Sequence, residues 1–267
     1  MWYEHWGLVR DPFQDEGAPY VPLASHDEAV ARLLHLIDSA EPVGFLRGDP
    51  GSGKSRVLGR ALEAARRPDR KFAMATGRMG RDALLGTLAR KLGGRPAEAA
   101  TESAALRSLR QAVAVCRIQG AAVVLVVDGD PEDADQRGLL VALLGLAREA
   151  GRVTVIAAGE DGDEAGEAEE ALASWSLRIR MPRLTFTEAE GYVRGRLDSA
   201  GCPEPLFGRR AMARLHLLSG GTPRGLNRLA SLSLMAASLR RLEAVPSDLV
   251  DDVSGECRLP VGLGPPA

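Results

Sequence analysis

The stretch Gly48-Asp49-Pro50-Gly51-Ser52-Gly53-Lys54-Ser55 decides the fold of this chain. It follows the pattern glycine, any four residues, glycine, lysine, then serine or threonine, which is typical of loops that bind nucleoside phosphates. An apolar run from Val43 to Leu46 precedes the loop, and a helical pattern begins near Lys54. Because a strand before and a helix after the loop are what phosphate binding requires, a glycine-rich turn without a ligand is the less favoured interpretation.

Each residue type in this loop has a physical role. The glycines Gly48, Gly51 and Gly53 permit dihedrals that other residues avoid, so successive N–H groups can turn toward phosphate oxygens. The free N–H groups and the positive dipole end of the following helix also favour an anion. We expect Lys54 to reach the β and γ phosphates of ATP and the Ser55 hydroxyl to ligate Mg²⁺. The predicted cofactor-binding loop is completed by Asp49, Pro50 and Ser52.

Length and composition are those of an ordinary globular protein. The chain has 267 residues, 45% of them hydrophobic and 26% charged, enough for one large domain or two smaller ones. A formal net charge of -2 requires neither nucleic acid nor acidic lipid as a partner. Three distant cysteines, Cys116, Cys202 and Cys257, argue against a disulfide framework and against a cysteine metal site. Neither a signal peptide nor a transmembrane segment is visible, so we expect a cytoplasmic protein.

Strand and helix patterns alternate on both sides of the loop. Predicted strands cover residues 43–47, 71–76, 121–127, 152–158 and 177–181. Predicted helices cover residues 26–39, 54–66, 81–92, 102–119 and 137–149. The first helix is expected to open with a capping box of Ser25 and Glu28. This alternation predicts an α/β fold, a three-layer P-loop NTPase sandwich around a central five-stranded parallel sheet.

The most apolar run in the chain, Ala121 to Val127, ends in Asp128. A continuous hydrophobic strand implies burial on both faces in the middle of a sheet. Its acidic end then lies at the carboxyl edge, where open α/β sheets bind ligands, and we expect Asp128 to meet Mg²⁺ through its water shell. A plain turn, Asp128-Gly129-Asp130-Pro131, is the alternative interpretation. The upstream phosphate loop favours the metal role.

Near residue 185 the pattern changes to helices alone. Thr187 and Glu190 predict a capping box, and Thr222 with Pro223 at the first turn predicts the start of a later helix. The tail contains glycine and proline and is expected to be disordered. We therefore expect an N-terminal strap (1–25), a nucleotide-binding domain (26–184), a small all-helical lid (185–253) and the tail (254–267).

The phosphate loop, Asp128 after its apolar strand, and a helical annex with Gly220-Gly221-Thr222-Pro223-Arg224 together resemble an AAA+ ATPase. In that family the arginine of such an element, called sensor 2, reaches from the lid to the γ phosphate, and the resemblance implies this role for Arg224. A guanidinium on a separate domain can couple phosphate charge to lid closure through bidentate contacts. The resemblance implies ATP and Mg²⁺ as cofactors, with Lys54, Asp128 and Arg224 as catalytic groups.

A narrower resemblance is to the general secretion pathway ATPases of the ExeA type, and it extends over about residues 1 to 250. It overlaps with ATP-dependent transposition adaptors, which share the ATPase core. The resemblance implies a protein partner from a secretion or transposition system, and an assembly of several copies. At the N-terminus it rests on Trp6-Gly7-Leu8, Asp11-Pro12-Phe13, Tyr20, Ser25, His26 and Glu28-Ala29. In the lid it rests on Leu184, Glu188, Tyr192, Arg196-Leu197, Ala200-Gly201, Leu206-Phe207, Pro223-Arg224 and Asn227.

Two positions depart from the family pattern. Gly129 stands where members carry a glutamate that polarises the attacking water, a group of a kind that contributes about 10² to 10⁴ in rate. Glu160 stands where the family resemblance suggests a glutamine after Gly159. Asp130 and Glu160 are the candidates to replace the missing glutamate. The expectation is an ATPase with weakened catalysis.

Three functions therefore remain open. The first is a Mg-ATP hydrolase that couples ATP to lid motion and to remodelling of a partner or oligomer, with Arg178 or Arg180 as an arginine finger. For both arginines an exposed face of an edge strand is the favoured interpretation. The second is a binding switch that hydrolyses ATP poorly. The third is a DNA-associated transposition adaptor, with phosphate contacts from exposed basic side chains. The candidates for those contacts are Arg66, Arg67, Arg70, Lys71, Arg209, Arg210 and Arg214.

Overall fold

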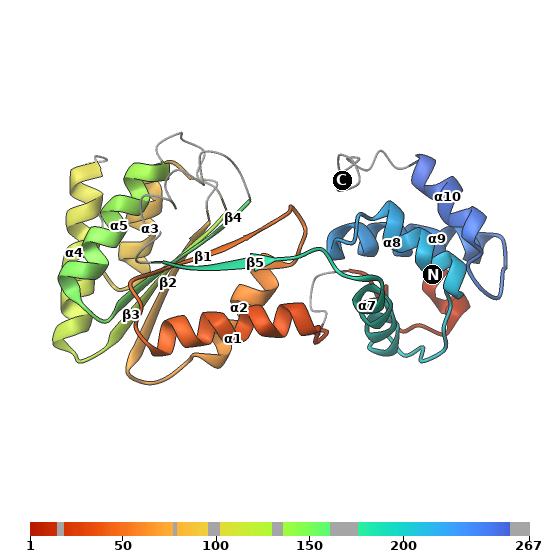
Figure 1. Ribbon diagram of the computed structural model, residues 1–267, viewed down its shortest axis with the longest axis horizontal. Helices are drawn as coiled ribbons and strands as arrows, with labels where there is room; N and C mark the ends of the chain where they lie inside the picture. Colours follow the sequence, from red (N-terminus) through yellow and green to blue (C-terminus); the bar gives the residue numbers. More distant parts are fainter. Residues whose placement is uncertain (15–18, 77–78, 96–101, 130–135, 161–175, 257–267) are drawn as a thin grey trace. The chain divides into compact units, whose positions relative to one another are not determined.

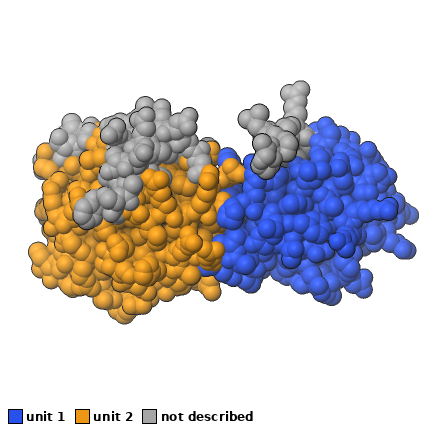
Figure 2. All heavy atoms as spheres, viewed as in Figure 1, with its two compact units in different colours: residues 1–27, 50–53, 182–267 blue, residues 28–49, 54–181 orange. Residues whose placement is uncertain are grey.

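The computed structural model describes residues 1–267 except for 15–18, 77–78, 96–101, 130–135, 161–175 and 257–267. The chain forms two compact units, drawn in separate colours in Figure 2. Unit 1 comprises Met1–Asp27, Pro50–Gly53 and Pro182–Ala267, and unit 2 comprises Glu28–Asp49 and Lys54–Met181. The N-terminal segment, the middle of the phosphate loop and the C-terminal helices thus belong to one unit. The boundaries of strap, domain and lid given above stay predictions.

Unit 2 is built on a five-stranded parallel sheet in the order β2-β3-β4-β1-β5 (Figure 1). The strands are β1 (Val43–Gly48), β2 (Arg70–Thr76), β3 (Ala122–Asp128), β4 (Val153–Gly159) and β5 (Ser176–Met181). Parallel neighbours need crossover connections, which explains why helices alternate with strands along the chain. The predicted five-stranded parallel sheet is confirmed.

Helices cover both faces of this sheet (Figure 1). They are α1 (Ala24–Asp38), α2 (Lys54–Ala64), α3 (Arg81–Lys91), α4 (Glu102–Ile118) and α5 (Gln136–Ala150). Buried side chains of α1 and α2 pack with Leu46 and Ile156, whereas those of α3, α4 and α5 pack with Phe45 and Val155. Because successive strand residues point to opposite faces, each central strand supplies both layers of the core. The three-layer arrangement is as predicted.

The central strands are buried on both faces. All seven residues of β4 are buried, and so are the five from Val123 to Val127 in β3. This explains why both read as continuous apolar runs in the sequence. At the margin of the sheet, β5 alternates buried Ile179 and Met181 with exposed Arg178 and Arg180. Strand burial therefore decreases from the middle of the sheet to its edge.

In the part that the structure describes, unit 1 packs helices α7 to α10 around the N-terminal segment. The elements are a 3-10 helix η1 (Trp2–Trp6) and the helices α7 (Phe186–Asp198), α8 (Arg209–Leu218), α9 (Pro223–Leu239) and α10 (Ser247–Glu256). Their core includes Trp6, Phe13, Leu215 and Leu234, each with less than a tenth of its surface exposed. The N-terminal segment therefore contributes aromatic side chains to a core that the C-terminal helices could not fill alone.

A buried arginine fixes the N-terminal segment to this core. Arg196 of α7 is 1% exposed, and its guanidinium donates hydrogen bonds to the carbonyl oxygens of Pro12 (2.6 Å) and Gln14 (2.7 Å). The Trp6 indole N–H donates to the Leu234 carbonyl oxygen at 3.2 Å. A buried guanidinium must satisfy its donors within the protein. The segment before α1 is thus held by specific backbone contacts.

Two predicted helix starts are wrong, and both involve Glu188. The capping box of α7 is formed by Thr185 and Glu188, not by Thr187 and Glu190. The sequence Thr-Phe-Thr-Glu-Ala-Glu contains two overlapping boxes, and the structure uses the earlier one. The α1 helix begins at Ala24, so Ser25 lies inside its first turn rather than at a cap. The Ser25 N–H instead donates to a carboxylate oxygen of Glu188 at 3.0 Å.

The C-terminal part agrees more closely with the sequence pattern. The Thr222 hydroxyl accepts a hydrogen bond from the Gly225 N–H, with Pro223 in the first turn of α9, as predicted. The last helix, α10, continues to Glu256, three residues beyond the predicted end of the lid at 253. The rest of the predicted disordered tail lies outside the described residues.

Two smaller expectations concern cysteines and membranes. Cys116 and Cys202 are buried and free of disulfides, whereas Cys257 lies outside the described part of the chain. Along the described stretches, no helix combines the length and the apolar character needed to cross a bilayer.

Candidate nucleotide-binding site

The phosphate loop occupies the junction that its sequence predicts. All six residues of β1 are buried, the strand ends at Gly48, and α2 begins at Lys54. Within unit 2 the Lys54 ammonium donates hydrogen bonds to the carbonyl oxygens of Gly48 (2.8 Å) and Asp49 (2.9 Å). These two neutral acceptors hold the ammonium against the start of its own loop. A phosphate oxygen is a stronger acceptor for an ammonium, so nucleotide binding can replace them favourably.

The register of the sheet brings Asp128 to the same edge as this loop. Asp128 is aligned with Ala158 of β4, and Ala158 is aligned with Leu46 of β1. With neighbouring strands spaced about 4.8 Å apart, the backbones of Leu46 and Asp128 are separated by about 10 Å across β4. Asp128 is half-buried at the end of its strand. Its carboxylate is therefore placed at the edge where the phosphate loop leaves β1, as a second acidic ligand for Mg²⁺ requires.

The backbone conformation of Gly129 gives a second reason for a glycine at this position, besides the loss of the family's glutamate. Its φ is +99°, a region in which residues with a Cβ are strained, and its N–H donates to the Ala158 carbonyl oxygen at 2.7 Å. The glycine thus extends the hydrogen bonding of β3 to β4 by one residue through a left-handed turn. The position that lacks the family's glutamate is also a position where the backbone favours glycine.

The two candidates to replace that glutamate are Asp130 and Glu160. Asp130 lies outside the described residues. Glu160 is exposed and directly follows β4, the strand between β1 and β3. Its backbone therefore lies at the same sheet edge as the phosphate loop and Asp128. This position in the fold suits a group that faces the nucleotide.

We predict that Gly129→Ala lowers the stability of the protein. Forcing a residue with a Cβ into this backbone region costs about 1–3 kcal/mol. The matched control is Gly145→Ala in the interior of α5, where a Cβ would meet nothing within 4 Å and helix propensity predicts a gain of about 0.5–1 kcal/mol. Urea and thermal denaturation of the two variants measure the difference. Equal stability of Gly129→Ala and the wild type would contradict the assigned strain.

Within unit 1, Arg224 lies directly against the middle of the phosphate loop. The Arg224 N–H donates to the Gly51 carbonyl oxygen at 3.2 Å. Gly51 has φ +80°, and a Cβ built on it would lie 2.6 Å from the Cβ of Arg224. With any other residue at 51, either the loop or the start of α9 would have to move. The structure thus brings the sensor 2 candidate and a phosphate-loop glycine together, and the Arg224 side chain itself is exposed.

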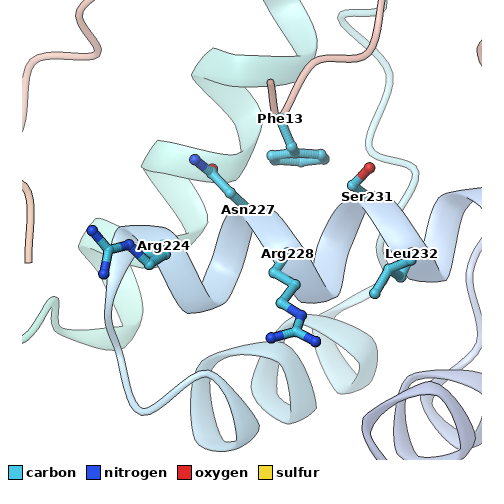
Figure 3. Close-up of a pocket in the computed structure, with 6 residues that line it drawn as sticks. All are labelled: Phe13, Arg224, Asn227, Arg228, Ser231 and Leu232. Carbon is cyan, nitrogen blue, oxygen red and sulfur yellow. The ribbon is translucent and has the colours of Figure 1, made fainter. Parts of the chain in front are cut away.

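A pocket of about 520 Å³ opens beside Arg224 on the surface of unit 1 (Figure 3). Hydrogen bonds fix two of the polar side chains that line it. Asn227 accepts a hydrogen bond from the Tyr192 hydroxyl (2.8 Å), and the Ser231 hydroxyl donates to Asp11 (3.0 Å). Among the described residues, the guanidinium groups of Arg224 and Arg228 have no hydrogen-bond or ion-pair partner. The lining residues are Phe13, Arg224, Asn227, Arg228, Ser231 and Leu232.

The other basic candidates divide into paired and exposed side chains. Arg67 and Arg70 both pair with Asp38, at 3.4 and 2.9 Å, and Arg214 pairs with Asp251. These intramolecular partners reduce the positive charge available to DNA phosphates. The remaining candidates, Arg66, Lys71, Arg209 and Arg210, are exposed. Arg178 and Arg180 lie on the exposed face of the edge strand β5, as the favoured interpretation expected.

One residue near the loop had no assigned role in the sequence analysis. His26 is 5% exposed and packs against Gly53 of the phosphate loop within unit 1. The sequence gives no local signal for this contact, because the two residues belong to different elements. Its place in the resemblance to ExeA-type ATPases was the one available indication.

A family described as an AAA domain matches residues 37–157 of this chain. The matched region includes the phosphate loop, β3 with Asp128, and most of β4. Over 65 residues, 24% of this chain, the sequence is 40% identical to the general secretion pathway protein A of Aeromonas hydrophila. The matched stretch spans 12% of that protein's length.

Solved structures share the fold. Cdc6p from Pyrobaculum aerophilum has a TM-score of 0.69 at 20% identity, and the comparison covers 93% of this chain and 71% of that one. The ORC1 protein of Aeropyrum pernix in complex with DNA has a TM-score of 0.65 at 17% identity, covering 94% of this chain and 69% of that one. These likenesses concern the fold alone. The AAA domain match confirms the resemblance to AAA+ ATPases, and the identity to protein A confirms the resemblance to the ExeA type over 65 residues. The wider extent of that resemblance, over about residues 1 to 250, stays a prediction.

Proposed function

We propose that this chain binds Mg-ATP at Gly48 to Ser55 and couples ATP occupancy to lid motion. The proposal follows from its match to an AAA domain and from its resemblance to the ExeA-type AAA+ ATPases. The observation that carries the proposal is the common sheet edge of β1 and β3. There the phosphate loop, with Lys54 held against its start, and Asp128 leave strands that are in register. We propose further that lid motion remodels a protein partner or an oligomer of this chain.

The residues at this edge suit the nucleotide and its metal ion. The backbone of the loop, with left-handed Gly51 and Gly53, can direct N–H groups to phosphate oxygens, while Lys54 supplies a positive charge. Ser55 and Asp128 supply oxygen ligands of the kind that Mg²⁺ prefers, together with phosphates and water. When bound, Mg²⁺ would neutralise charge on the transferred phosphoryl group. The protein's own residues then hold the phosphates in a single orientation.

We propose that hydrolysis is slow, because no carboxylate follows Asp128 directly. Gly129 has no side chain that orients the attacking water, and Glu160 is the described group whose backbone position suits a substitute. A binding switch that scarcely hydrolyses ATP is the second candidate, favoured by the same glycine. Calorimetric affinity for Mg-ATP, followed by single-turnover hydrolysis, separates the two. Absence of binding contradicts both candidates, and turnover at ordinary AAA+ rates contradicts weakened catalysis.

The partner is proposed to be a protein of a secretion system, by analogy with the general secretion pathway protein A of Aeromonas hydrophila. A cytoplasmic location and a homo-oligomer, with exposed Arg178 or Arg180 as arginine finger, belong to the same proposal. DNA is the alternative partner, since the ORC1 relative is in complex with DNA. Phosphate contacts make binding fall steeply with salt, so a duplex titration between about 50 and 200 mM salt tests this alternative.

We predict that Arg224→Ala abolishes most of the preference for ATP over ADP. Its guanidinium is proposed to contact the γ phosphate, and loss of one such donor lowers turnover by about 10² to 10³ where turnover occurs. The affinity for ADP is expected to stay within about threefold of the wild type, because ADP lacks the contacted group. Parallel calorimetric titrations with ATP and ADP measure the change.

The control for this variant is Arg210→Ala, which removes another exposed arginine of unit 1 on α8. It is expected to keep the wild-type preference. If Arg224→Ala retains that preference as well, Arg224 does not sense the γ phosphate.

A further inference from the structure

His26 packs tightly against Gly53 of the phosphate loop. His26 and the loop residues Pro50–Gly53 belong to unit 1. A Cβ built on Gly53 would lie 3.0 Å from Cε1 of the imidazole and 3.5 Å from its Nε2. With 5% of its surface exposed, the ring is enclosed. The imidazole of His26 therefore packs directly against the second half of the loop.

Polar atoms at this contact are buried without complete hydrogen bonding. The imidazole has a hydrogen bond to the backbone of Ser52. Its Nε2 and the Ser52 hydroxyl are both buried, and neither has a hydrogen-bond partner among the described residues. Buried polar groups without partners are rare in proteins, and each one calls for an explanation. Here they lie next to the loop that is proposed to bind phosphates.

We propose that His26 is a positioning residue of the phosphate loop: the neutral imidazole holds Ser52 and Gly53 in the conformation that takes nucleotide phosphates, and protonation of the ring releases them. This inference rests on the proposed function, because it assigns a regulator to the same loop. It makes ATP affinity dependent on pH through a residue that is not one of the proposed metal ligands. Since α1 carries the histidine, the loop is supported by the helix that precedes β1.

Burial of the ring, which outweighs the charges around it, determines the direction of this dependence. Burial lowers the pKa of His26, and Glu188 of α7, the Ser52 backbone and Asp27 of α1 oppose it less strongly. The loop segment 50–53 contributes no ionisable side chain, and Arg224 of α9 lies against it at Gly51. The pKa in the held loop is therefore below the ordinary value of about 6.5. The held loop is fully stable above that pH, and its stability is lost as the pH falls below it.

The test measures Mg-ATP affinity between pH 5.5 and 8.0 for the wild type and His26→Gln. Glutamine keeps a hydrogen-bonding amide but gains no proton in this range. We expect wild-type affinity to fall about fivefold or more, relative to His26→Gln, between pH 7.5 and 5.5. Taking the ratio at each pH cancels the titration of ATP itself. His35→Ala, an exposed histidine of the same helix, is the control and is expected to follow the wild-type profile.

A second measurement does not depend on ATP. Proton NMR of the imidazole Cε1–H group is expected to show His26 titrating below the ordinary value of about 6.5 for histidine. The protection factors of amides 51–53, which correct each exchange rate for its intrinsic pH dependence, are expected to fall at low pH in the wild type alone. If the wild type binds no Mg-ATP at pH 8, the proposed function fails, while these two readouts still test the histidine. Equal pH profiles for wild type and His26→Gln, or an ordinary titration of His26, would overturn the inference.

Discussion

Replacing Lys54 by alanine is expected to weaken Mg-ATP binding by at least about 100-fold. A hydrogen bond to a charged group contributes about 1.5–3 kcal/mol, and this ammonium is proposed to reach two phosphates. In the structure its hydrogen bonds go to the neutral carbonyl oxygens of Gly48, which is buried, and Asp49, which is half-buried. Their loss is expected to change the unfolding temperature only slightly. Calorimetry for binding and calorimetric melting for stability measure the two effects separately.

Lys71→Ala is the matched control for this variant. Lys71 is an exposed lysine of the same unit, located on β2. The control removes the same charge from unit 2 and is expected to bind Mg-ATP like the wild type. Wild-type affinity in Lys54→Ala would mean that nucleotide does not bind at this loop, and the central proposal would fail with it.

Asp128→Asn is expected to remove the Mg²⁺ dependence of ATP binding and to lower any turnover by about 10² to 10⁴. Asparagine keeps the shape of the side chain at the end of β3 but lacks the charge that attracts a hard cation. The measurement compares ATP affinity in Mg²⁺ with affinity in a chelator. The wild type is expected to bind more tightly with the metal, and the variant is expected to show no difference. This readout holds even if hydrolysis is too slow to follow.

The control for Asp128→Asn lies at the opposite edge of the sheet. Asp69 directly precedes β2 and is exposed, so Asp69→Asn removes the same charge from unit 2 at the amino ends of the strands. Because nucleotides bind at the carboxyl ends of such strands, this change is expected to leave the metal dependence intact. If both variants behave alike, the effect is one of net charge, and Asp128 is not a metal ligand.

The parts of the fold that sequence predicted well are those with local signals. The phosphate loop carries its own pattern, and the apolar run before Asp128 identifies a central strand and its carboxyl end together. Local patterns failed where a distant residue decides. Glu188 selects the earlier of two overlapping capping boxes, and it also binds the Ser25 N–H, 163 residues away in sequence. No window of sequence contains both partners of that contact.

The site shows the same division. Lys54, Ser55 and Asp128 were predicted from their positions next to strands. The sheet register places the end of β1 and Asp128 at one edge of the sheet, and the roles of the three residues stay predictions. Gly129 was interpreted as a missing glutamate, whereas its positive φ shows a backbone preference that composition cannot reveal. His26 was missed because its burial depends on how the start of α1 meets the loop. Site residues that belong to a local motif could be predicted from the sequence, whereas contacts between separate elements could not.

The contact between Arg196 and Pro12 has a consequence for synthesis on the ribosome. The two residues are 184 positions apart, so at about 5–20 residues per second the N-terminal segment waits roughly 10 to 40 s for its arginine to be made. During that time Trp6 and Phe13, which are buried in the finished protein, have no core to enter. A nascent chain of this protein therefore exposes aromatic side chains from the beginning of translation until its last third emerges.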